Sequence, residues 1–385
     1  MKNFLFRLYL RLMKLGASLT KINQKHLVIL NGAGRSGSNG YLFAKYMRAN
    51  HPEYDVTVVE PWPSSHLSFK TWRKIGRAKF VLTTHSPFKV HAKQVNIQFW
   101  HGIPLKRMGI MANNTTSRAD WRNAKLWQKN TDLVCSSSDL YETLMSACTA
   151  VEAAKYHKVG FPRLDALSRP VISKDQLLQD LFKQRDEQAQ IVIYMPTFRY
   201  ELADQEVMAQ ISAGNFLTLP DFAAARLNES LRINHQYLIV KLHPYELSLI
   251  GDLNSHFSNI SFLNNDYLTE HDADLYELLG STDSLITDFS SVYFDYLNLD
   301  KPIIFVTNYL KQYEQERGLL LGPYDRVVPG SCVKTQAELV HALAAPDKYQ
   351  TQRKYWLDLT NQVHSDSYCA DIFNLMIQKG EEDKL

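Results

Sequence analysis

The sequence predicts an α/β protein made of two Rossmann-like domains with a cleft between them. Three observations lead to this prediction. The chain has 385 residues, which exceeds the usual size of one hydrophobic core, so two domains are expected. Short apolar runs alternate with helical patterns, which is typical of a parallel sheet with crossover helices. A polar, helical stretch at residues 173–189 interrupts this alternation, and a second series of apolar runs follows it.

The two series of apolar runs define the expected domains. The first domain is expected at residues 26–175, and its predicted strands are 26–30, 56–59, 80–83, 95–99, 132–135 and 158–160. The second is expected at residues 176–385, with predicted strands 190–195, 237–242, 259–263, 284–287 and 302–306. Ligands of such sheets bind beyond the carboxyl ends of the strands. Residues that directly follow a strand are therefore the first candidates for a site.

Composition narrows the class of protein. Hydrophobic residues make up 45% and charged residues 22% of the chain, as in ordinary globular proteins. The net charge of +3 gives no global signature of polyanion binding, so no nucleic-acid partner is expected. The four cysteines are scattered without a CxxC pair, which favours free thiols in a reducing cytoplasm. No cluster of acidic residues and histidines indicates a metal site, and no metal or cofactor is expected.

Residues 1–25 form a basic segment that differs from the rest of the chain. No acidic residue precedes Glu53, and at helical spacing Arg7, Arg11 and Lys14 share one face opposite a broad apolar surface. This pattern suits a helix lying on an anionic membrane surface. The segment is too short and too charged to span a bilayer, and it lacks a clear signal-peptide pattern. We therefore expect peripheral membrane association; the alternative is an amphipathic helix packed on its own domain.

The segment TDSLITDFSSVYFDY has the pattern of a phosphate-binding turn. An apolar strand ends at Thr287, and Asp288 and Ser290 are residue types that favour helix N-caps. Free backbone N–H groups at a helix start, the helix dipole and the hydroxyls of Ser290 and Ser291 can meet an anion together. The alternative is a capped crossover helix without a ligand.

The segment QFWHGIPLKRMG places a histidine on a loop at the end of a predicted strand. His101 follows an apolar run and precedes a glycine and a proline, while Lys106 and Arg107 add positive charge nearby. A neutral imidazole near pH 7 can take a proton from an attacking hydroxyl. His101 is therefore a candidate general base, and the alternative is a loop histidine with solvated neighbours.

Two shorter segments place further polar residues after strands. In VKLHP, His243 follows a buried-type strand and is expected to donate to a phosphate oxygen, with Lys241 adding charge if it faces the ligand. In YMPTFR, Arg199 lies just beyond a strand and is suited to bidentate phosphate binding. Each segment alone is weak evidence, since polar residues commonly follow strands.

A glycine-rich turn follows the first predicted strand. Gly32, Gly34 and Gly37 fit the GxGxxG pattern, and Glu60 ends the next strand, which is the layout of a dinucleotide fingerprint. The pattern is short and the helix after it is poorly marked. We therefore favour a glycine-rich turn that opens the domain, with dinucleotide binding as the alternative.

Taken together, these segments resemble the CDP-glycerol glycerophosphotransferase family of teichoic acid primases and polymerases. The resemblance runs in the family's order from about residue 95 to 345, through FWHGIPLKRMG, VGFPRLDAL, IYMPTFR, VKLHP, DLYELLGSTDSLITDFSSVYFDYLNLDKPIIF and RGLLLGPYDRVVPGSCVKTQAEL. The chain departs from the family at Leu319 and Leu320, where an aromatic pair is usual, and at Ser331, where a proline is usual. These departures leave the contacts of that loop, and the polyol that is transferred, open.

The resemblance implies a GT-B fold, with the donor bound by the C-terminal half. It implies that His101 is the base acting on the acceptor hydroxyl, and that the pyrophosphate is contacted by His243, Ser290, Ser291 and Arg199. The implied donor is CDP-glycerol or a related CDP-polyol. The implied acceptor is a lipid-linked saccharide or polymer at the cytoplasmic face of the cell membrane.

Other functions remain as alternatives. A GT-B glycosyltransferase that uses a nucleotide sugar would share the fold and the pyrophosphate site, and transfer from UDP-sugars would identify it. A non-catalytic, membrane-bound assembly subunit would need neither histidine. The sequence leaves glycerol or ribitol phosphate, and primase or polymerase, undecided.

Overall fold

The computed structural model describes residues 2–60, 62, 66–113, 117–199, 205–250 and 257–382. Its contacts divide the chain into two compact units. The first comprises residues 1–101, 116–165 and 362–385, and the second comprises residues 102–115 and 166–361. The chain therefore returns to the first unit at its C-terminal end, whereas the sequence assigned residues 176–385 to one domain.

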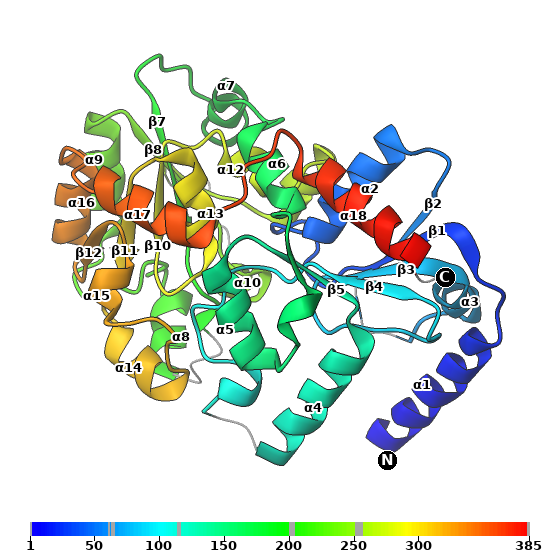
Figure 1. Ribbon diagram of the computed structural model, residues 1–385. Helices are drawn as coiled ribbons and strands as arrows, with labels where there is room; N and C mark the ends of the chain where they lie inside the picture. Colours follow the sequence, from blue (N-terminus) through cyan, green and yellow to red (C-terminus); the bar gives the residue numbers. More distant parts are fainter. Residues whose placement is uncertain are drawn as a thin grey trace. The chain divides into compact units, whose positions relative to one another are not determined.

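The first unit is built on a six-stranded parallel sheet with the strand order β2-β1-β3-β4-β5-β6 (Figure 1). Its strands are β1 (Asn23–Leu30), β2 (Asp55–Val59), β3 (Ala78–Thr83), β4 (Val95–Gln98), β5 (Leu133–Ser136) and β6 (Tyr156–Lys158). Every residue of β3, β4 and β5 is buried. Burial on both faces is typical of a parallel sheet covered by crossover helices. Five of the six predicted strands are confirmed, whereas the sixth, predicted at 158–160, lies at Tyr156–Lys158.

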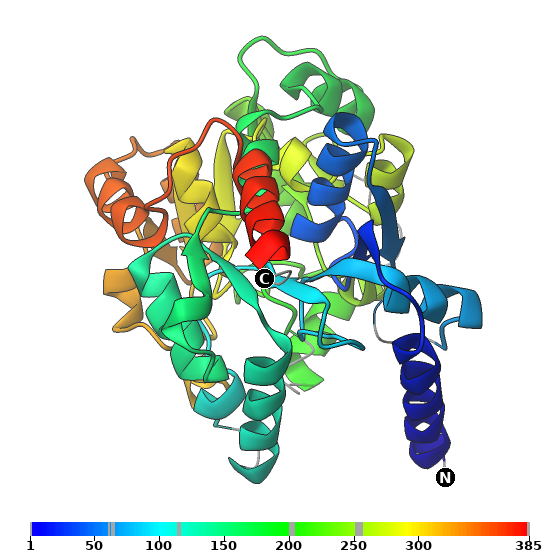
Figure 2. The ribbon, with the colours of Figure 1, turned by 45° about the vertical axis from the view of Figure 1, so that its right-hand side comes forward.

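Helices cover this sheet. They are α1 (Lys2–Ser18), α2 (Asn39–Asn50), α3 (Phe69–Arg77), α4 (Ser117–Asn130), α5 (Asp139–Thr149) and α18 (Tyr368–Glu382), with a short turn η2 (Ala153–Lys155). The helix α18 packs against β3 and β4 (Figure 2). A Cβ atom on Gly380 would lie 2.7 Å from the ring of Phe80, so this residue lets α18 approach the sheet. That packing is why residues 362–385 belong to the first unit.

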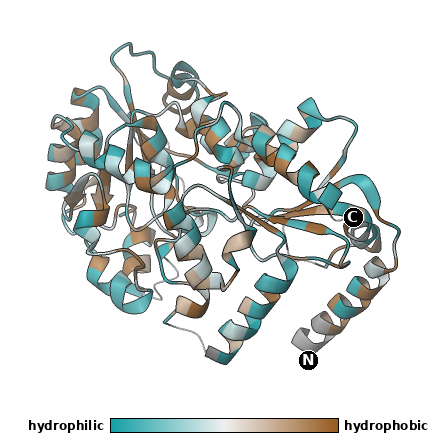
Figure 3. Ribbon diagram, in the orientation of Figure 1, coloured by the Kyte–Doolittle hydropathy of each residue, from teal (hydrophilic) through white to brown (hydrophobic). Residues whose placement is uncertain are grey.

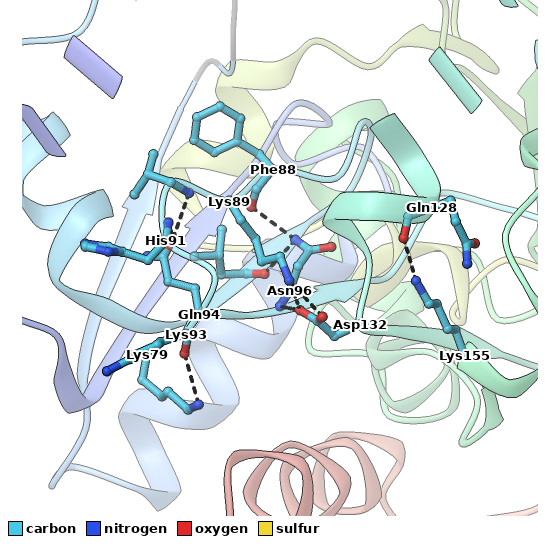
Figure 4. A network of polar contacts seen from close by, with 12 residues as sticks. Lys79, Phe88, Lys89, His91, Lys93, Gln94, Asn96, Gln128, Asp132 and Lys155 are labelled. Carbon is cyan, nitrogen blue, oxygen red and sulfur yellow. Dashed lines mark hydrogen bonds and ion pairs between the residues drawn. The ribbon is translucent and has the colours of Figure 1, made fainter. Parts of the chain in front are cut away.

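A buried polar network fixes the connection between β3 and β4 (Figure 4). Lys89 donates to both carboxylate oxygens of Asp132 at 2.7 Å, and the same carboxylate accepts from the backbone N–H of Asn96 at 2.7 Å. The Asn96 amide donates to Val81 O at 2.9 Å, while Gln94 donates to Ile75 O and Ala78 O. Because buried polar groups need partners, these bonds hold the start of β4, the strand whose other end leads to His101.

The helix α1 was predicted to turn its apolar surface to a membrane, but part of that surface packs on its own unit. Tyr9, Leu10 and Met13 pack with the buried Ala17 against Trp72 and its neighbours, and the Tyr9 hydroxyl donates to the Leu67 carbonyl. A second apolar face of α1 stays exposed, at Leu8, Leu12 and Leu15, followed by Leu19. In Figure 3 the coloured part of the helix alternates between hydrophobic and hydrophilic residues. No helix of the described residues is long and apolar enough to cross a bilayer.

Of the three basic residues predicted to share a face of α1, Lys14 makes a contact within its own unit. The ammonium group of Lys14 lies 4.9 Å from the centre of the Phe88 ring, and partial burial, with a contribution from Lys129, lowers the pKa of Lys14. Arg11 is exposed. The side chain of Arg7 lies outside the described residues. The helix therefore carries one apolar face toward its own unit and another toward solvent.

The second unit contains another six-stranded parallel sheet, with the order β12-β11-β10-β7-β8-β9. Its strands are β7 (Gln190–Met195), β8 (Gln236–Val240), β9 (Ile260–Phe262), β10 (Ser284–Thr287), β11 (Ile303–Val306) and β12 (Ser331–Val333). One face of the sheet packs through Val192, Tyr194, Leu238, Val240 and Ile286 into a large apolar core. The five strands predicted for this domain are confirmed, and β12 is an addition at the edge.

The helices of the second unit are mostly short. They are α7 (Lys174–Leu177) with the π-helical turn η3 (Leu178–Phe182), α8 (Gln205–Ser212), α9 (Ala224–Ile233), α10 (Pro244–Ile250), α11 (Asn265–Glu270), α12 (Tyr276–Leu279), α13 (Val292–Tyr296) with the 3-10 turn η6 (Leu297–Leu299), α14 (Leu310–Glu316), α15 (Tyr324–Val327), α16 (Gln336–Ala344) and α17 (Gln350–Thr360). The turn η1 (Gly109–Met111) also belongs here, and α6 (Pro162–Ser168) contains the point where the chain enters this unit. The crossover helices place the loops after β7, β8 and β10 at one edge of the sheet, since all its strands are parallel.

Candidate functional site

His243 lies on the loop after β8 and has a defined ring orientation. The side chain is exposed, and its ring stacks on Phe198 from the loop after β7, with centroids 3.9 Å apart and planes at 25°. The backbone N–H of Tyr245 donates to Nδ1 of His243 at 3.3 Å. A neutral imidazole whose Nδ1 accepts a hydrogen bond carries its proton on Nε2. His243 therefore presents an N–H donor, as a phosphate oxygen requires.

Ser290 and Ser291 precede α13 and are partly exposed. Ser291 is the residue before the helix, and its side chain makes no cap hydrogen bond. Neither hydroxyl is bonded to another group within the part of the chain that the structure describes. The two hydroxyls therefore stand at the carboxyl edge of the sheet without competing internal partners, where the sequence placed them.

Asp288 has a different role from the predicted one. Its side chain is buried and accepts from the backbone N–H and the hydroxyl of Thr197, both at 2.7 Å. The Tyr324 hydroxyl donates to its backbone carbonyl at 2.6 Å, and burial raises the pKa of the Asp288 carboxyl. The residue therefore ties the loop after β10 to the loop after β7. It does not cap α13, because its carboxylate points inward to Thr197.

Arg199 is also turned into the protein. Its guanidinium is 4% exposed and faces Glu246, which is fully buried, with Nη2 3.4 Å from the carboxylate. Nη1 donates to Phe216 O at 2.8 Å, and the backbone N–H of Arg199 donates to Glu246 at 2.7 Å. A buried carboxylate needs a paired cation. The two NH₂ groups that a bidentate phosphate contact needs are thus already bonded within the unit.

Lys241 is buried on the strand side of the His243 loop. Its side chain is 7% exposed, and Nζ donates to the Asn265 side chain at 3.0 Å and to Leu242 O at 3.4 Å. Burial lowers the pKa of Lys241 to about 8. The ammonium group is directed at neutral protein groups, so the condition attached to its predicted role, that it faces the ligand, is not supported by these contacts.

Lys106 joins two of the segments that carried the family resemblance. It forms an antiparallel bridge with Leu319, flanked by bonds from Arg107 N to Gly318 O at 3.0 Å and from Leu320 N to Leu105 O at 2.8 Å. Gly318 has a φ of 72°, and a Cβ atom there would lie 2.8 Å from the Arg107 side chain. Residues 102–107 and the RGLLL segment therefore support each other within the second unit, although more than 200 residues separate them.

His101 lies in the first unit, on the loop after β4, and is exposed. Its Nδ1 is 3.1 Å from the carbonyl oxygen of Thr84. A carbonyl only accepts hydrogen bonds, so Nδ1 carries the proton and Nε2 is the basic ring nitrogen. The ring also contacts that of Trp100 at 4.0 Å, a residue whose φ of 54° is unusual outside glycine. His101 is thus held in the tautomer that a general base requires.

The glycine-rich turn after β1 is organised from within. The Asn31 carboxamide accepts from Ser38 at 2.8 Å and from Ala33 N at 3.2 Å, and it donates to Gly34 O at 3.0 Å. The same amide donates to the Glu60 carboxylate at 2.9 Å. These bonds form a self-supporting turn that leads into α2, which agrees with the interpretation favoured from the sequence.

Two residues at the carboxyl edge of the first sheet were not singled out from the sequence. They are His85, after β3, and Gln98, at the end of β4. His85 follows the predicted strand 80–83, so the position after a strand was the available signal for it, whereas Gln98 lies inside the predicted strand 95–99. Gln98 is fully buried; its amide oxygen accepts from Trp100 N at 2.8 Å, and its amide nitrogen donates to the carbonyl of His85. A glutamine inside an apolar strand gives no hint of such a bridging role until the neighbouring loop is placed.

Comparison with known proteins gives the family. A family model described as CDP-Glycerol:Poly(glycerophosphate) glycerophosphotransferase matches residues 17–374. The teichoic acid glycerol-phosphate primase of Bacillus subtilis (strain 168) is 27% identical over 284 residues, which cover 73% of this chain and 67% of the primase. The teichoic acid poly(glycerol phosphate) polymerase of the same strain is 25% identical over 359 residues, or 86% of this chain, but only 45% of the polymerase.

The fold agrees with a solved relative. The structure of the wall teichoic acid polymerase TagF matches with a TM-score of 0.76 and 20% identity, covering 99% of this chain and 96% of that one. At this identity the likeness concerns the fold, and with the two parallel six-stranded sheets it confirms the two Rossmann-like domains of the GT-B type. Because the family model matches nearly all of the sequence, the chain belongs to the CDP-glycerol:poly(glycerophosphate) glycerophosphotransferase family and is an enzyme of that family.

Proposed function

We propose that this enzyme transfers glycerol phosphate from CDP-glycerol to a lipid-linked acceptor of wall polymer synthesis and releases CMP. The family membership and the names of the relatives support the donor, as does a match to a TagF variant soaked with CDPG. The observation that carries the mechanism is the pair of opposite histidine tautomers. His101 has its proton on Nδ1, which makes Nε2 the basic nitrogen, whereas Nδ1 of His243 accepts a hydrogen bond, which places the proton on Nε2.

In the proposed reaction, the acceptor hydroxyl oxygen attacks the phosphorus that carries glycerol. A new P–O bond forms, the bond between that phosphorus and the CMP oxygen breaks, and the hydroxyl proton passes to Nε2 of His101. Phosphoryl transfer depends mainly on positioning and on stabilising charge over the phosphate oxygens. A general base contributes roughly 10²–10⁴-fold, so His101 is needed for an efficient reaction.

On the donor side, we assign phosphate binding to His243, Ser290 and Ser291. The His243 N–H and the two hydroxyls lie on loops at the carboxyl edge of one sheet, and the Phe198 ring supports His243. Asp288 and Arg199 do not contact the donor in this proposal. They hold the loops that carry the phosphate-binding groups, through hydrogen bonds to Thr197 and Glu246. Donors fixed in advance stabilise developing charge without reorganising during the reaction.

We further propose that the first unit rests on an anionic membrane surface. Leu8, Leu12, Leu15 and Leu19 are 42–81% exposed and recur at helical spacing, which gives one apolar stripe. Next to Leu19, a groove of about 600 Å³ is lined by Lys21, Arg73 and Arg77, and another of about 620 Å³ is lined by Lys21, Lys79, His91 and Lys93. An apolar stripe beside basic grooves suits acyl chains beside anionic headgroups.

One experiment tests the proposed activity. Purified enzyme is incubated with a lipid-linked disaccharide and with CDP-glycerol, CDP-ribitol or a UDP-sugar, and the lipid products are weighed by mass spectrometry. We expect the acceptor to gain the mass of glycerol phosphate, with one CMP released for each unit added. A gain from a UDP-sugar alone would refute the proposal in favour of glycosyl transfer. The number of units added separates a primase from a polymerase.

A further inference from the structure

A second imidazole packs against the candidate base. The rings of His85 and His101 are stacked with centroids 4.6 Å apart and planes at 29°. Both belong to the first unit, where His85 follows β3 and His101 follows the neighbouring strand β4. The adjacency of two parallel strands therefore brings the two histidines to the same edge of the sheet.

The position of His85 is fixed by contacts to its backbone and to its ring. Nδ1 of His85 lies 3.1 Å from the Thr84 hydroxyl. The buried amide of Gln98 bonds the His85 carbonyl and the Trp100 N–H together. Since Trp100 precedes His101, one side chain ties the loop of each histidine to the other. Thr84 adds a further link, because its carbonyl accepts from His101.

Gly32, in the glycine-rich turn, makes room for the His85 ring. A Cβ atom on Gly32 would lie 2.8 Å from Nδ1 of His85 and 3.2 Å from the Trp62 carbonyl. The N–H of Gly32 donates to the Thr84 hydroxyl at 3.1 Å, the same hydroxyl that meets His85. Gly32 has no positive φ that would demand glycine, so the close approach of His85 is what the missing side chain permits.

His85 is uncharged, which is favourable for a residue that packs against a general base. Burial lowers the pKa of His85, so its ring is neutral near pH 7. When His101 takes the proton of the acceptor hydroxyl, it becomes a cation. A neutral aromatic ring against that cation does not repel it, whereas a second protonated histidine would.

We propose that His85 is a positioning residue for His101: its neutral ring, seated over Gly32 and tied through Gln98, holds the His101 imidazole with Nε2 directed at the acceptor hydroxyl. The inference rests on the proposed function, in which His101 is the base. His85 itself neither binds the donor nor exchanges the proton. Small displacements of a catalytic group cost up to about 10²-fold in rate, so loss of the stacked ring should be visible in kcat.

The test uses His85→Ala, His85→Phe, Gly32→Ala and the double variant Gly32→Ala/His85→Ala. Initial rates give kcat and the KM for the acceptor, and calorimetry gives the Kd for CDP-glycerol. We expect His85→Ala to lower kcat by about 10- to 100-fold with the donor Kd within about twofold. His85→Phe, which keeps a flat ring, should recover most of the rate. Gly32→Ala should resemble His85→Ala, and the double variant should lose no more than either single one.

The matched control is His51→Ala. His51 is another histidine of this unit with a closely stacked ring, on Phe373 with centroids 3.6 Å apart, and its removal should leave kcat unchanged. Thermal unfolding of each variant checks that the fold is kept; if His85→Ala does not fold, His85→Phe and Gly32→Ala decide. An unchanged kcat in His85→Ala, equal losses in the Ala and Phe variants, or additive losses in the double variant would overturn the proposal. His101→Ala separates the failure of this proposal from the failure of the proposed function. Activity that survives His101→Ala refutes the role of His101 as base, whatever His85 does.

Discussion

The carbonyl oxygen of Thr84 accepts a hydrogen bond from Nδ1 of His101 at 3.1 Å. This bond decides which ring nitrogen is basic, because it keeps the proton on Nδ1 and makes Nε2 the nitrogen that can accept one. The corresponding bond at His243 has the opposite sense, with Nδ1 accepting from Tyr245 N. The two histidines are thus prepared for different tasks, and their variants should differ in kind.

His101→Ala should reduce kcat by at least about 100-fold, the usual contribution of a general base. A base acts only along the reaction coordinate, so CDP-glycerol should bind nearly as well as before. Initial rates and calorimetry on the same preparation measure both quantities. His157→Ala, a half-buried histidine on β6, is the control. If His101→Ala kept more than about a tenth of the wild-type rate, the assignment as base would be withdrawn.

His243→Ala should weaken donor binding as well as the rate. The Nε2–H of His243 is proposed to donate to a phosphate oxygen, and a hydrogen bond to a charged group contributes about 1.5–3 kcal/mol. The Kd for CDP-glycerol should therefore rise by about 10- to 100-fold. His235→Ala, which removes another exposed histidine of the same unit, paired with Asp186 at 2.8 Å, should leave the Kd unchanged. An unaltered donor Kd in His243→Ala would remove His243 from the phosphate site.

Arg199→Met should destabilise the second unit more than it affects donor binding. The change leaves the fully buried Glu246 without its cation, and breaking a buried pair costs about 3–5 kcal/mol. Urea unfolding measures this loss. The double variant Arg199→Met/Glu246→Leu should recover part of the stability, because both charged groups are then absent. A folded, stable Arg199→Met enzyme with a greatly raised donor Kd would restore the phosphate contact predicted from the sequence.

The comparison of Arg199 with Ser290 shows how far the sequence was informative. Strands were predicted from short apolar runs, and parallel strands place their following loops at one edge, so the loops that carry the candidate residues could be predicted. The direction of a side chain within a loop depends on partners distant in the chain. Arg199 turns inward because it pairs with the buried Glu246. Asp288 turns inward because Thr197 offers two hydrogen-bond donors. No local pattern encodes such pairings.

The same limit explains the domain boundaries. The amphipathic pattern of α18 predicts a helix with one buried face, but not which sheet that face covers. Its contact with β3 and β4 depends on Gly380 admitting the Phe80 ring. The bridge between Lys106 and Leu319 likewise joins segments that are far apart in the sequence. Local periodicity predicts elements, whereas these pairings come from the packing of whole units.

Lys241→Met should stabilise the protein near neutral pH. The folded-state pKa of Lys241, about 8, lies below the usual value of about 10.4. From about pH 8 to 10.4 the unfolded chain holds more protons on this group, so stability rises with pH across that window. Below pH 8 the group is charged in both states, and the folded state bears the full cost of burying it. Replacement by an apolar residue of similar length removes that cost.

Urea unfolding of wild type and Lys241→Met at pH 7 and pH 10 measures the difference. The gain should be larger at pH 7 and should shrink at pH 10, where the wild-type lysine is neutral when folded. Lys311→Met, at an exposed position of α14, should show no such dependence. A loss of stability at pH 7 would contradict the assignment of an uncompensated buried charge. A raised donor Kd in the stable variant would mean that Lys241 faces the donor after all.

Membrane binding should depend on the exposed leucines of the first unit. Leu12→Ser, Leu15→Ser and Leu19→Ser combined should release the enzyme from vesicles that contain anionic lipid, because each buried leucine contributes about 1.5–3 kcal/mol. These residues are exposed, so the fold and the transfer to a soluble acceptor should be retained. Ile233→Ser, at a 63% exposed position of the second unit, is the control.

Sedimentation with anionic and with neutral vesicles measures binding. Wild type should prefer the anionic ones, because the grooves beside Leu19 are basic. Equal sedimentation of the triple variant and wild type would show that α1 is only a packed structural helix.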